Sequence, residues 1–211
     1  MDKYELNKNT FNKLAIQYQN RFMDYDGYTD TFDLFVNEIA KYDASILEIA
    51  CGPGNVTQYL LRHNSNYKIY GIDIAPKMID LARINNPSAK FDVMDCRYLS
   101  HVSDNFDAII CAFGLPYLTR EDAIKLINNS CTILNDNGLL YLSTMEGMYD
   151  DSEFVKSSSY QESTFVYYHE AAYLKDTLRN NNMKILHEIR KPYTNADGKD
   201  FVDLFVIAMK Q

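Results

Sequence analysis

The segment Ile46-Leu-Glu-Ile-Ala-Cys-Gly-Pro-Gly-Asn55 passes from apolar residues directly into a turn that contains two glycines. Gly52 and Gly54 lack side chains where the chain must reverse and where a ligand would contact bare backbone, and Pro53 restricts the turn between them. The residues that follow, 56–63, place their apolar side chains on one helical face. The segment therefore predicts a strand, a preorganised loop and a helix packed on a sheet.

The spacing around this loop predicts a ligand with a ribose and a charged group. Unpaired N–H groups at the start of the helix favour an anion, either a phosphate or a carboxylate. The next apolar segment, 68–73, ends at Asp73, and its distance from Gly54 matches the interval of about 20 residues in ribose-binding units. A carboxylate there can accept hydrogen bonds from both ribose hydroxyls. An adenosyl cofactor is the expected ligand.

Details of the loop discriminate between adenosyl cofactors. A dinucleotide fingerprint places a third glycine where this chain has Thr57, which counts against NAD and FAD. By contrast, the segment Glu48-Ile-Ala-Cys-Gly-Pro-Gly54 resembles the first motif of the class I S-adenosylmethionine (SAM)-dependent methyltransferases. In that family the loop lies against the methionine part of SAM. The family often has glycine where this chain has Ala50 and Asn55.

The resemblance continues into the following strands. The segment 71–79 resembles the second motif of the family, which implies that Ile74 and Met78 form walls for the adenine. The strand at 91–96 ends in Asp95 and Cys96, like the adenine-recognition site of the family. There an acid accepts from the exocyclic amine. Asp95 alone is also consistent with a cap of the following turn.

The remaining implied cofactor contacts lie in the fourth strand and in the N-terminal segment. The strand at 106–112 and its exit loop resemble the strand beneath the sulfonium, and a helical, aromatic N-terminus resembles a cap with a tyrosine near that group. We select Tyr18 for this role, although ordinary helix packing is the simpler interpretation. The full set implied by the resemblance is Tyr18, Glu48, Ala50, Cys51, Gly52, Gly54, Asp73, Ile74, Met78, Asp95, Cys96, Cys111 and Phe113.

Composition favours a soluble enzyme core. With 211 residues and 46% hydrophobic content, and without a linker-like stretch, we expect one domain over 1–211. No apolar run is long enough to span a membrane and the start lacks a signal peptide, so we expect a cytoplasmic protein without a membrane partner. The four cysteines lack paired metal spacing and fit small buried thiols in a reducing compartment, so no metal is expected.

The net charge of −8 weighs against a nucleic-acid partner, because proteins that bind polyanions normally carry a basic stripe. The lysines and arginines of this chain are scattered along the sequence. The expected partner is therefore a small-molecule methyl acceptor, and the oligomeric state is left open.

Strands alternating with helices predict an α/β fold: a Rossmann-like three-layer sandwich with a seven-stranded, mostly parallel sheet and an antiparallel last strand. We expect helices at 31–41, 120–134 and 171–181, and strands near 46–50, 68–73, 89–94, 106–112, 139–144, 184–191 and 201–209. The last two strands flank a turn rich in Asn, Asp and Gly at 195–198.

Two segments lie outside this scaffold. Residues 1–30 are expected to form a helical cap, and residues 145–169 an insertion that covers the substrate as a lid. The insertion is aromatic, with Tyr149, Phe154, Tyr160, Phe165, Tyr167 and Tyr168. Aromatic walls with few charges suit a small, partly apolar acceptor, although simple lid packing is the commoner role of such residues.

The chemistry expected is in-line transfer of the methyl group of SAM to the acceptor, with S-adenosylhomocysteine as product. Because the sulfonium already activates the methyl group, positioning can suffice. If a proton must be removed, His169 and Tyr117 are the candidate bases, with a surface or capping role as the alternative for His169. Two other functions remain open: a non-catalytic SAM-binding or regulatory module, and, disfavoured by Thr57, a nicotinamide-dependent oxidoreductase.

Overall fold

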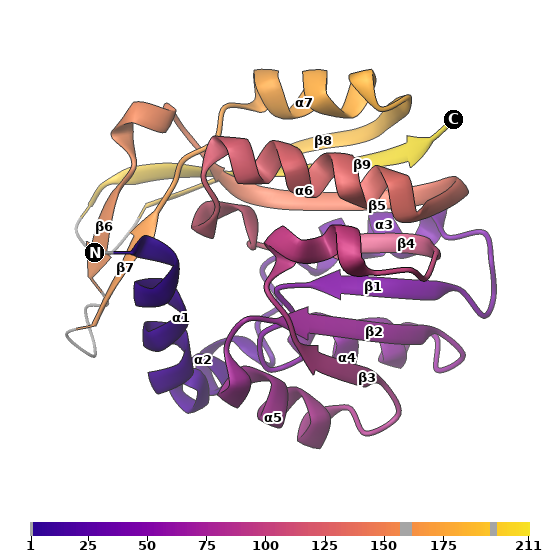
Figure 1. The fold of residues 1–211 in the computed structure, drawn as a ribbon, viewed down its shortest axis with the longest axis horizontal. Helices are drawn as coiled ribbons and strands as arrows, with labels where there is room; N and C mark the ends of the chain where they lie inside the picture. Colours follow the sequence, from indigo (N-terminus) through magenta and orange to yellow (C-terminus); the bar gives the residue numbers. More distant parts are fainter. Residues whose placement is uncertain (1, 157–161, 195–197) are drawn as a thin grey trace.

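A seven-stranded sheet in the order β3-β2-β1-β4-β5-β9-β8 runs through the computed structural model, which describes residues 2–156, 162–194 and 198–211 (Figure 1). β9 pairs antiparallel with both of its neighbours, β5 and β8, and the other strand pairs of this sheet are parallel. This arrangement confirms the predicted fold class. The strands are β1 (Ser45–Ile49), β2 (Lys68–Asp73), β3 (Lys90–Val93), β4 (Phe106–Cys111), β5 (Leu134–Glu146), β8 (Met183–Thr194) and β9 (Asp200–Lys210). The strand order reverses between β1 and β4, and ligands of such sheets bind in the crevice at this point.

Helices cover both faces of the sheet because the strand side chains alternate between them. On β5, Tyr141 packs with α3 (Thr29–Glu38) and α4 (Asn55–His63), whereas Leu140 and Leu142 pack with α6 (Arg120–Ile133) and α7 (Ala171–Asn180). The helix α5 (Pro76–Asn85) contacts β3 at the edge of the sheet. No helix in the described part of the chain has the length and apolar character needed to cross a bilayer.

The N-terminal segment forms two helices, α1 (Lys3–Lys13) and α2 (Ala15–Phe22), which lie beside the carboxyl ends of the central strands (Figure 1). Three short 3₁₀ helices occur in connecting segments: η1 (Cys96–His101), η2 (Leu115–Tyr117) and η3 (Tyr149–Asp151). The loop that contains η2 follows β4, so it reaches the same edge of the sheet as the glycine turn after β1.

The insertion contains a second, two-stranded sheet of β6 (Glu153–Lys156) and β7 (Ser163–Val166), which the sequence did not predict. Residues 157–161, with the expected lid residue Tyr160, lie outside the described residues, as do residues 195–197 of the expected turn. The β8 and β9 strands are longer than expected and pair out to Thr194 and Asp200. They therefore extend the sheet edge toward the insertion.

Candidate active site

The glycine turn after β1 has the backbone conformation predicted for it. Gly52 and Gly54 adopt φ values of +53° and +81°, in the left-handed region that favours glycine. A Cβ atom added at Gly54 would lie 2.4 Å from Asn86 Nδ2, so a side chain is also excluded by packing. Gly54 is the N-cap residue of α4, so the helix begins directly after the turn. The first N–H groups of α4 therefore face the loop.

The two departures from the family motif behave differently. Ala50 lies in the left-handed region with φ +56°, which costs an alanine free energy that a glycine would not lose. Asn55 is the first residue of α4 and needs no such conformation, because Gly54 before it has the left-handed backbone.

Two asparagines at the end of α5 hold the turn in place, and sequence reasoning did not select them. Asn86 Nδ2 donates to the carbonyl of Gly54 at 2.9 Å, and Asn85 Nδ2 donates to that of Pro53 at 2.8 Å. Asn86 is only 3% exposed, so its amide has no access to bulk water. The signal available in the sequence was the pair of adjacent asparagines at the expected end of a helix, a position where asparagine often serves as a capping residue.

Asp73, at the end of β2, is oriented by backbone donors. Its Oδ2 accepts from Gly52 N at 2.9 Å and its Oδ1 from Ala75 N at 2.8 Å. Burial raises the pKa of this carboxyl group, and these two hydrogen bonds oppose the shift. Each oxygen keeps a further lone pair, so the carboxylate can still accept from the hydroxyls of a ribose.

Glu48 is a buried acid next to the turn. It is 2% exposed and accepts a hydrogen bond from the Thr57 hydroxyl. Burial raises its pKa to about 8, and the Thr57 contact lowers it only in part. A buried acid of this kind ionises when a cationic group binds beside it. The ammonium group of the methionine part of SAM fits that requirement.

Tyr18 of α2 lies over the turn. A Cβ atom added at Gly52 would be 3.7 Å from the Tyr18 ring, with no other atom as near. Burial, Asp73 and Glu48 raise the pKa of the Tyr18 hydroxyl to about 12, so it stays protonated at neutral pH. The N-terminal segment thus covers the cofactor loop as a cap, with an aromatic ring next to its open backbone.

The expected adenine walls lie just after β2 and in α5, and the expected adenine-binding acid follows β3. Ile74 is half-buried, whereas Met78 is buried in a cluster with Ala15 and Ala75, between α5 and the N-terminal helices. Asp95 caps η1 by accepting from Arg97 N at 2.9 Å, and the Arg97 guanidinium binds both carboxylate oxygens. The structure therefore shows the capping role of Asp95 directly.

The three cysteines at the strand ends are thiols without disulfides. Cys51 and Cys111 are buried and Cys96 is half-buried. Burial raises all three pKa values, that of Cys111 to about 12, so these side chains are neutral at physiological pH. Among the residues described, no group of three metal-ligating side chains occurs.

Phe113 and Tyr117 follow β4. Phe113 adopts φ +56° and its N–H donates to Ser143 Oγ at 2.9 Å, which anchors the exit loop to β5. The Tyr117 ring meets Phe11 of α1 edge-on at 4.8 Å. Burial and the neighbouring hydroxyls of Tyr18 and Tyr193 raise the pKa of Tyr117 above its usual range. Tyr117 is therefore placed between the cofactor cap and the β8 strand.

His169 occupies a buried structural position, which argues against the predicted role as a base. It is 0% exposed, and its Nε2 lies 2.8 Å from the carbonyl oxygen of Leu115. Since a carbonyl only accepts, Nε2 carries the proton and Nδ1 accepts from the Tyr173 hydroxyl. Burial lowers its pKa to about 4. Neither ring nitrogen is free to receive a proton from a substrate, so His169 joins the insertion to η2.

The cap and the insertion are joined by side-chain-to-backbone hydrogen bonds. Asn7 of α1 donates to the Phe165 carbonyl at 2.9 Å and accepts from the Phe165 N–H at 2.8 Å. Thr10 donates to the Ser163 carbonyl at 2.9 Å. In effect, α1 occupies the free edge of the β6–β7 sheet (Figure 1). The two segments expected as cap and lid therefore form one cover.

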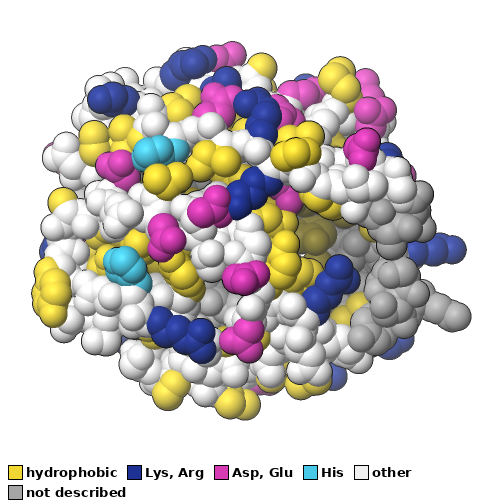
Figure 2. Space-filling model, turned by 180° about the vertical axis from the view of Figure 1, so that it is seen from behind, with side chains coloured by type: hydrophobic (Ala, Val, Ile, Leu, Met, Phe, Trp, Pro, Cys, Tyr) yellow, Lys and Arg dark blue, Asp and Glu magenta, His cyan; other side chains and the backbone are white. Residues whose placement is uncertain are grey.

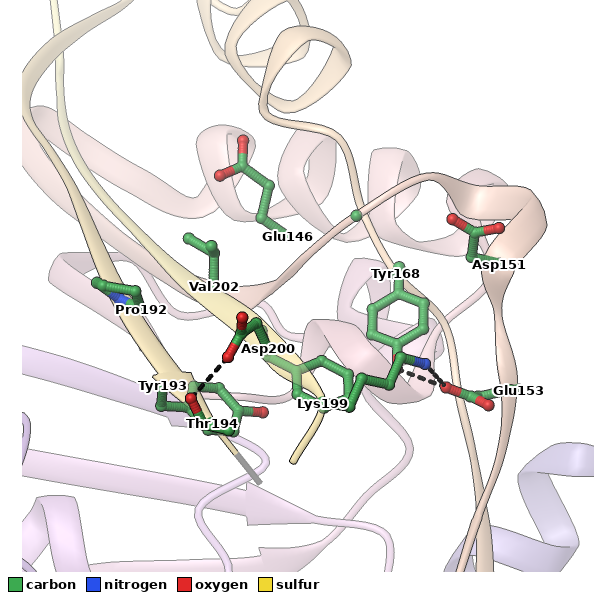
Figure 3. A pocket seen from close by; sticks show the side chains of 12 residues that line it. Glu146, Asp151, Glu153, Tyr168, Pro192, Tyr193, Thr194, Lys199, Asp200 and Val202 are labelled. Atoms are coloured by element: carbon green, nitrogen blue, oxygen red, sulfur yellow. Dashed lines mark hydrogen bonds and ion pairs between the residues drawn. The ribbon is translucent and has the colours of Figure 1, made fainter. Parts of the chain in front are cut away.

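A cavity of about 1020 Å³ lies between the insertion and the extended β8–β9 strands (Figure 3). Tyr168 and Glu153 line it from the insertion, and Tyr193 and Phe201 from the extended strands. On the face opposite to that of Figure 1, a hollow exposes hydrophobic side chains, and lysines and arginines are interspersed with acids (Figure 2).

Asp203 of β9 is a buried acid that the sequence analysis did not select. It is 2% exposed and accepts from the Tyr28 hydroxyl at 2.6 Å. Burial raises its pKa to about 6, and the Tyr28 hydrogen bond opposes the shift. An acid that interrupts the apolar run 201–208 was the signal available in the sequence.

The fold and the turn together define a class of protein: a doubly wound α/β domain with an adenosyl-cofactor loop at its switch point. Comparison with known proteins identifies the family. Residues 46–138 match the model of a methyltransferase domain. This match, together with the similarity to named methyltransferases, supports a class I SAM-dependent methyltransferase with SAM as its cofactor, and the nicotinamide alternative is set aside.

The relatives differ in their acceptors. The chain is 27% identical to a tRNA N(3)-methylcytidine methyltransferase of Schizosaccharomyces pombe, over 79% of this chain and 73% of that one. It is 28% identical to a malonyl-[acyl-carrier protein] O-methyltransferase of Ilyobacter polytropus, over 68% of this chain but 53% of that relative.

Solved structures share the fold. The magnesium protoporphyrin IX methyltransferase from Synechocystis with bound SAM has a TM-score of 0.72 at 18% identity, covering 100% of this chain and 98% of that one. TehB from Haemophilus influenzae also has a TM-score of 0.72, at 16% identity, covering 92% of this chain and 66% of that one.

Proposed function

We propose that this protein transfers the methyl group of SAM to a small-molecule acceptor. One observation carries the proposal: Tyr18 covers the cofactor turn, and the same edge of the sheet holds a cavity of about 1020 Å³ between the insertion and the β8–β9 strands. The volume is in the range of sites that bind small molecules. The cover of α1 and the β6–β7 hairpin lies over the same edge of the sheet.

In this proposal each group has one task. SAM supplies an electrophilic methyl group when bound. Asp73 accepts from the ribose, Glu48 balances the ammonium group, and the bare backbone at Gly52 and Gly54 faces the methionine part. The remaining cofactor contacts proposed are Ala50, Cys51, Ile74, Met78, Asp95, Cys96, Cys111 and Phe113. The cover excludes water, and Tyr18 and Tyr117 position the reacting groups.

A nucleic-acid acceptor is the competing possibility, because the tRNA methyltransferase named above is a relative. The net charge of −8 and the acids around the cavity oppose a polyanion. We therefore favour the small molecule on electrostatic grounds.

The cofactor arm of the test is calorimetric titration with SAM, S-adenosylhomocysteine and NAD, repeated on Asp73→Ala. We expect micromolar binding of the two sulfur ligands, about tenfold or more weaker in the variant, and no binding of NAD. Glu121→Gln, on the exposed face of α6, is the control and should bind like the wild type.

The acceptor arm offers SAM with a labelled methyl group to a cell extract separated into a small-molecule fraction and a tRNA fraction. Label in the small-molecule fraction supports the proposal. Label in tRNA would show that the acceptor assignment is wrong. Cofactor binding without transfer to either fraction would support a non-catalytic SAM-binding module instead.

A further inference from the structure

One wall of the cavity between the insertion and the β8–β9 strands is a row of nearly parallel aromatic rings. Tyr193 stacks on Phe201 at 5.4 Å with an interplanar angle of 19°, and Phe201 stacks on Tyr168 at 6.2 Å and 23°. Aromatic faces attract cations. A cation of the chain itself shows this: Lys199 Nζ lies 5.1 Å from the Phe201 centroid and 6.0 Å from that of Tyr168.

Acids dominate the charges around the cavity. The lining contains Glu146, Asp151, Glu153 and Asp200 against a single base, Lys199 (Figure 3). Arg190 pairs with Glu146 and Lys199 with Glu153, which leaves Asp151 and Asp200 without an ion pair among the described residues. A carboxylate ligand would be repelled here, whereas a cation would be attracted.

Asp203 adds a buried negative charge behind this wall. Its Oδ2 accepts from Tyr28, while its Oδ1 accepts no hydrogen bond within the described residues. It lies two residues after Phe201 on β9, so its side chain shares a face of the sheet with Phe201 and Tyr193 of the cavity wall. The nearby Lys191 binds Asp30 and the Gly27 carbonyl instead. Burying a carboxylate without a cation is costly, so an added cation would stabilise it.

The aromatic wall is continuous with the cofactor side. Behind the wall, Asp203 accepts from the Tyr28 hydroxyl, and the Tyr28 ring packs against Phe113 at 5.0 Å. Phe113 belongs to the exit loop of β4, where a Cβ atom added at Gly114 would lie 3.0 Å from Ala50 of the cofactor turn. A ligand against Tyr193 would therefore lie on the acceptor side of the methyl group.

We propose that the methyl acceptor is a small molecule with a cationic amine, which binds with its charge near Asp203 and against the acidic, aromatic wall of this cavity. This inference rests on the proposed function and specifies its substrate class. It assigns the charge of the acceptor, and not the atom that is methylated.

The test compares ligands matched in size and opposite in charge. Benzylamine, phenethylamine and tyramine are titrated against benzoate, phenylacetate and 4-hydroxyphenylacetate by ligand-detected NMR, with the protein saturated with S-adenosylhomocysteine. We expect each amine to bind about tenfold or more tightly than its carboxylate partner. Asp203→Asn should weaken amine binding about tenfold and leave S-adenosylhomocysteine binding unchanged. Asp150→Asn, an exposed acid outside the cavity, is the matched control.

The asparagine at position 203 can still accept from Tyr28, so the variant removes charge and keeps the hydrogen bond. If it does not fold, the pH dependence of the wild type replaces it. The groups that face Asp203 are Tyr28, Tyr193, Tyr141 and, over the Tyr28 ring, Lys191. Because the pKa of Asp203 is about 6, amine affinity should fall as pH is lowered through that value.

The outcomes separate the two proposals. Equal binding of both charges, preference for the carboxylates, or no amine binding with S-adenosylhomocysteine bound would overturn the inference and leave the proposed function intact. Failure of S-adenosylhomocysteine to bind would overturn the proposed function, and the amine comparison is then made on the free protein.

Discussion

At the scale of single residues, the carboxyl edge of the sheet carries two buried acids. One of them can be recognised from the sequence and the other only from the structure. Glu48 belongs to a motif, so the sequence indicates it. Asp203 lies in an apolar strand, and only its burial gives it significance. Both have raised pKa values because burial disfavours their charge. If each faces a cationic group as proposed, binding of that group will release a proton.

Glu48→Gln should stabilise the unliganded protein increasingly as pH rises. The folded pKa is about 8, above the unfolded value, so the folded state holds an extra proton between the two. The free energy of unfolding of the wild type then falls with pH in this window, by at most about 1.4 kcal/mol per pH unit. Urea unfolding at about pH 5 and about pH 8 measures the difference between variant and wild type. A difference that is the same at both pH values would contradict the assignment.

Ala50→Gly should raise the free energy of unfolding by about 1 kcal/mol, because φ +56° is unfavourable for alanine and not for glycine. Ala75, with φ −92° at a similarly buried site, is the matched control. Ala75→Gly should lose about 0.5–1 kcal/mol. Urea unfolding of the three proteins tests this, and a loss of stability in both variants would show that Ala50 is not strained.

At the scale of elements, the cover over the site depends on contacts between distant parts of the chain. The regular helices and strands follow from local patterns, so the sequence predicted them to within a few residues. The β6–β7 hairpin was missed because its stable pairing depends on Asn7, more than 150 residues away. A short polar side chain carries no local signal for such a partner.

Asn7→Ala should loosen this cover. It leaves the N–H and C=O of Phe165 without partners, at a cost of about 1–3 kcal/mol. We expect faster amide hydrogen exchange in residues 163–166 and weaker binding of S-adenosylhomocysteine. Lys8→Ala, on the same helix in a surface pair with Glu5, is the control. Unchanged exchange in Asn7→Ala would show that the hairpin is held by other contacts.

At the scale of the whole molecule, the fold could be predicted because three central strands end in a readable signal: glycines after β1, Asp73 at the end of β2, and a proline-containing turn after β4. The proposed acceptor side could not, since its residues come from α3, β8, β9 and the insertion. Charges that are scattered in the sequence, such as Glu146 and Asp200, meet around one cavity only after folding.

Binding of the cofactor should raise the free energy of unfolding of the whole domain. Ligand at about 100 times its Kd adds about 2.7 kcal/mol, which raises Tm by roughly 5–10 °C for a chain of this length. A thermal melt with S-adenosylhomocysteine should show this rise, whereas NAD should leave Tm unchanged. An equal rise with NAD would mean that the loop does not discriminate between the two.

The hydrogen bonds of Asn7 and Thr10 have a kinetic consequence. Since α1 is fastened to the hairpin, the segment over the cofactor and the segment over the acceptor must open together. If the acceptor binds as proposed, we expect a single opening motion to admit both reactants and release both products. Its rate would then limit turnover whichever acceptor is bound.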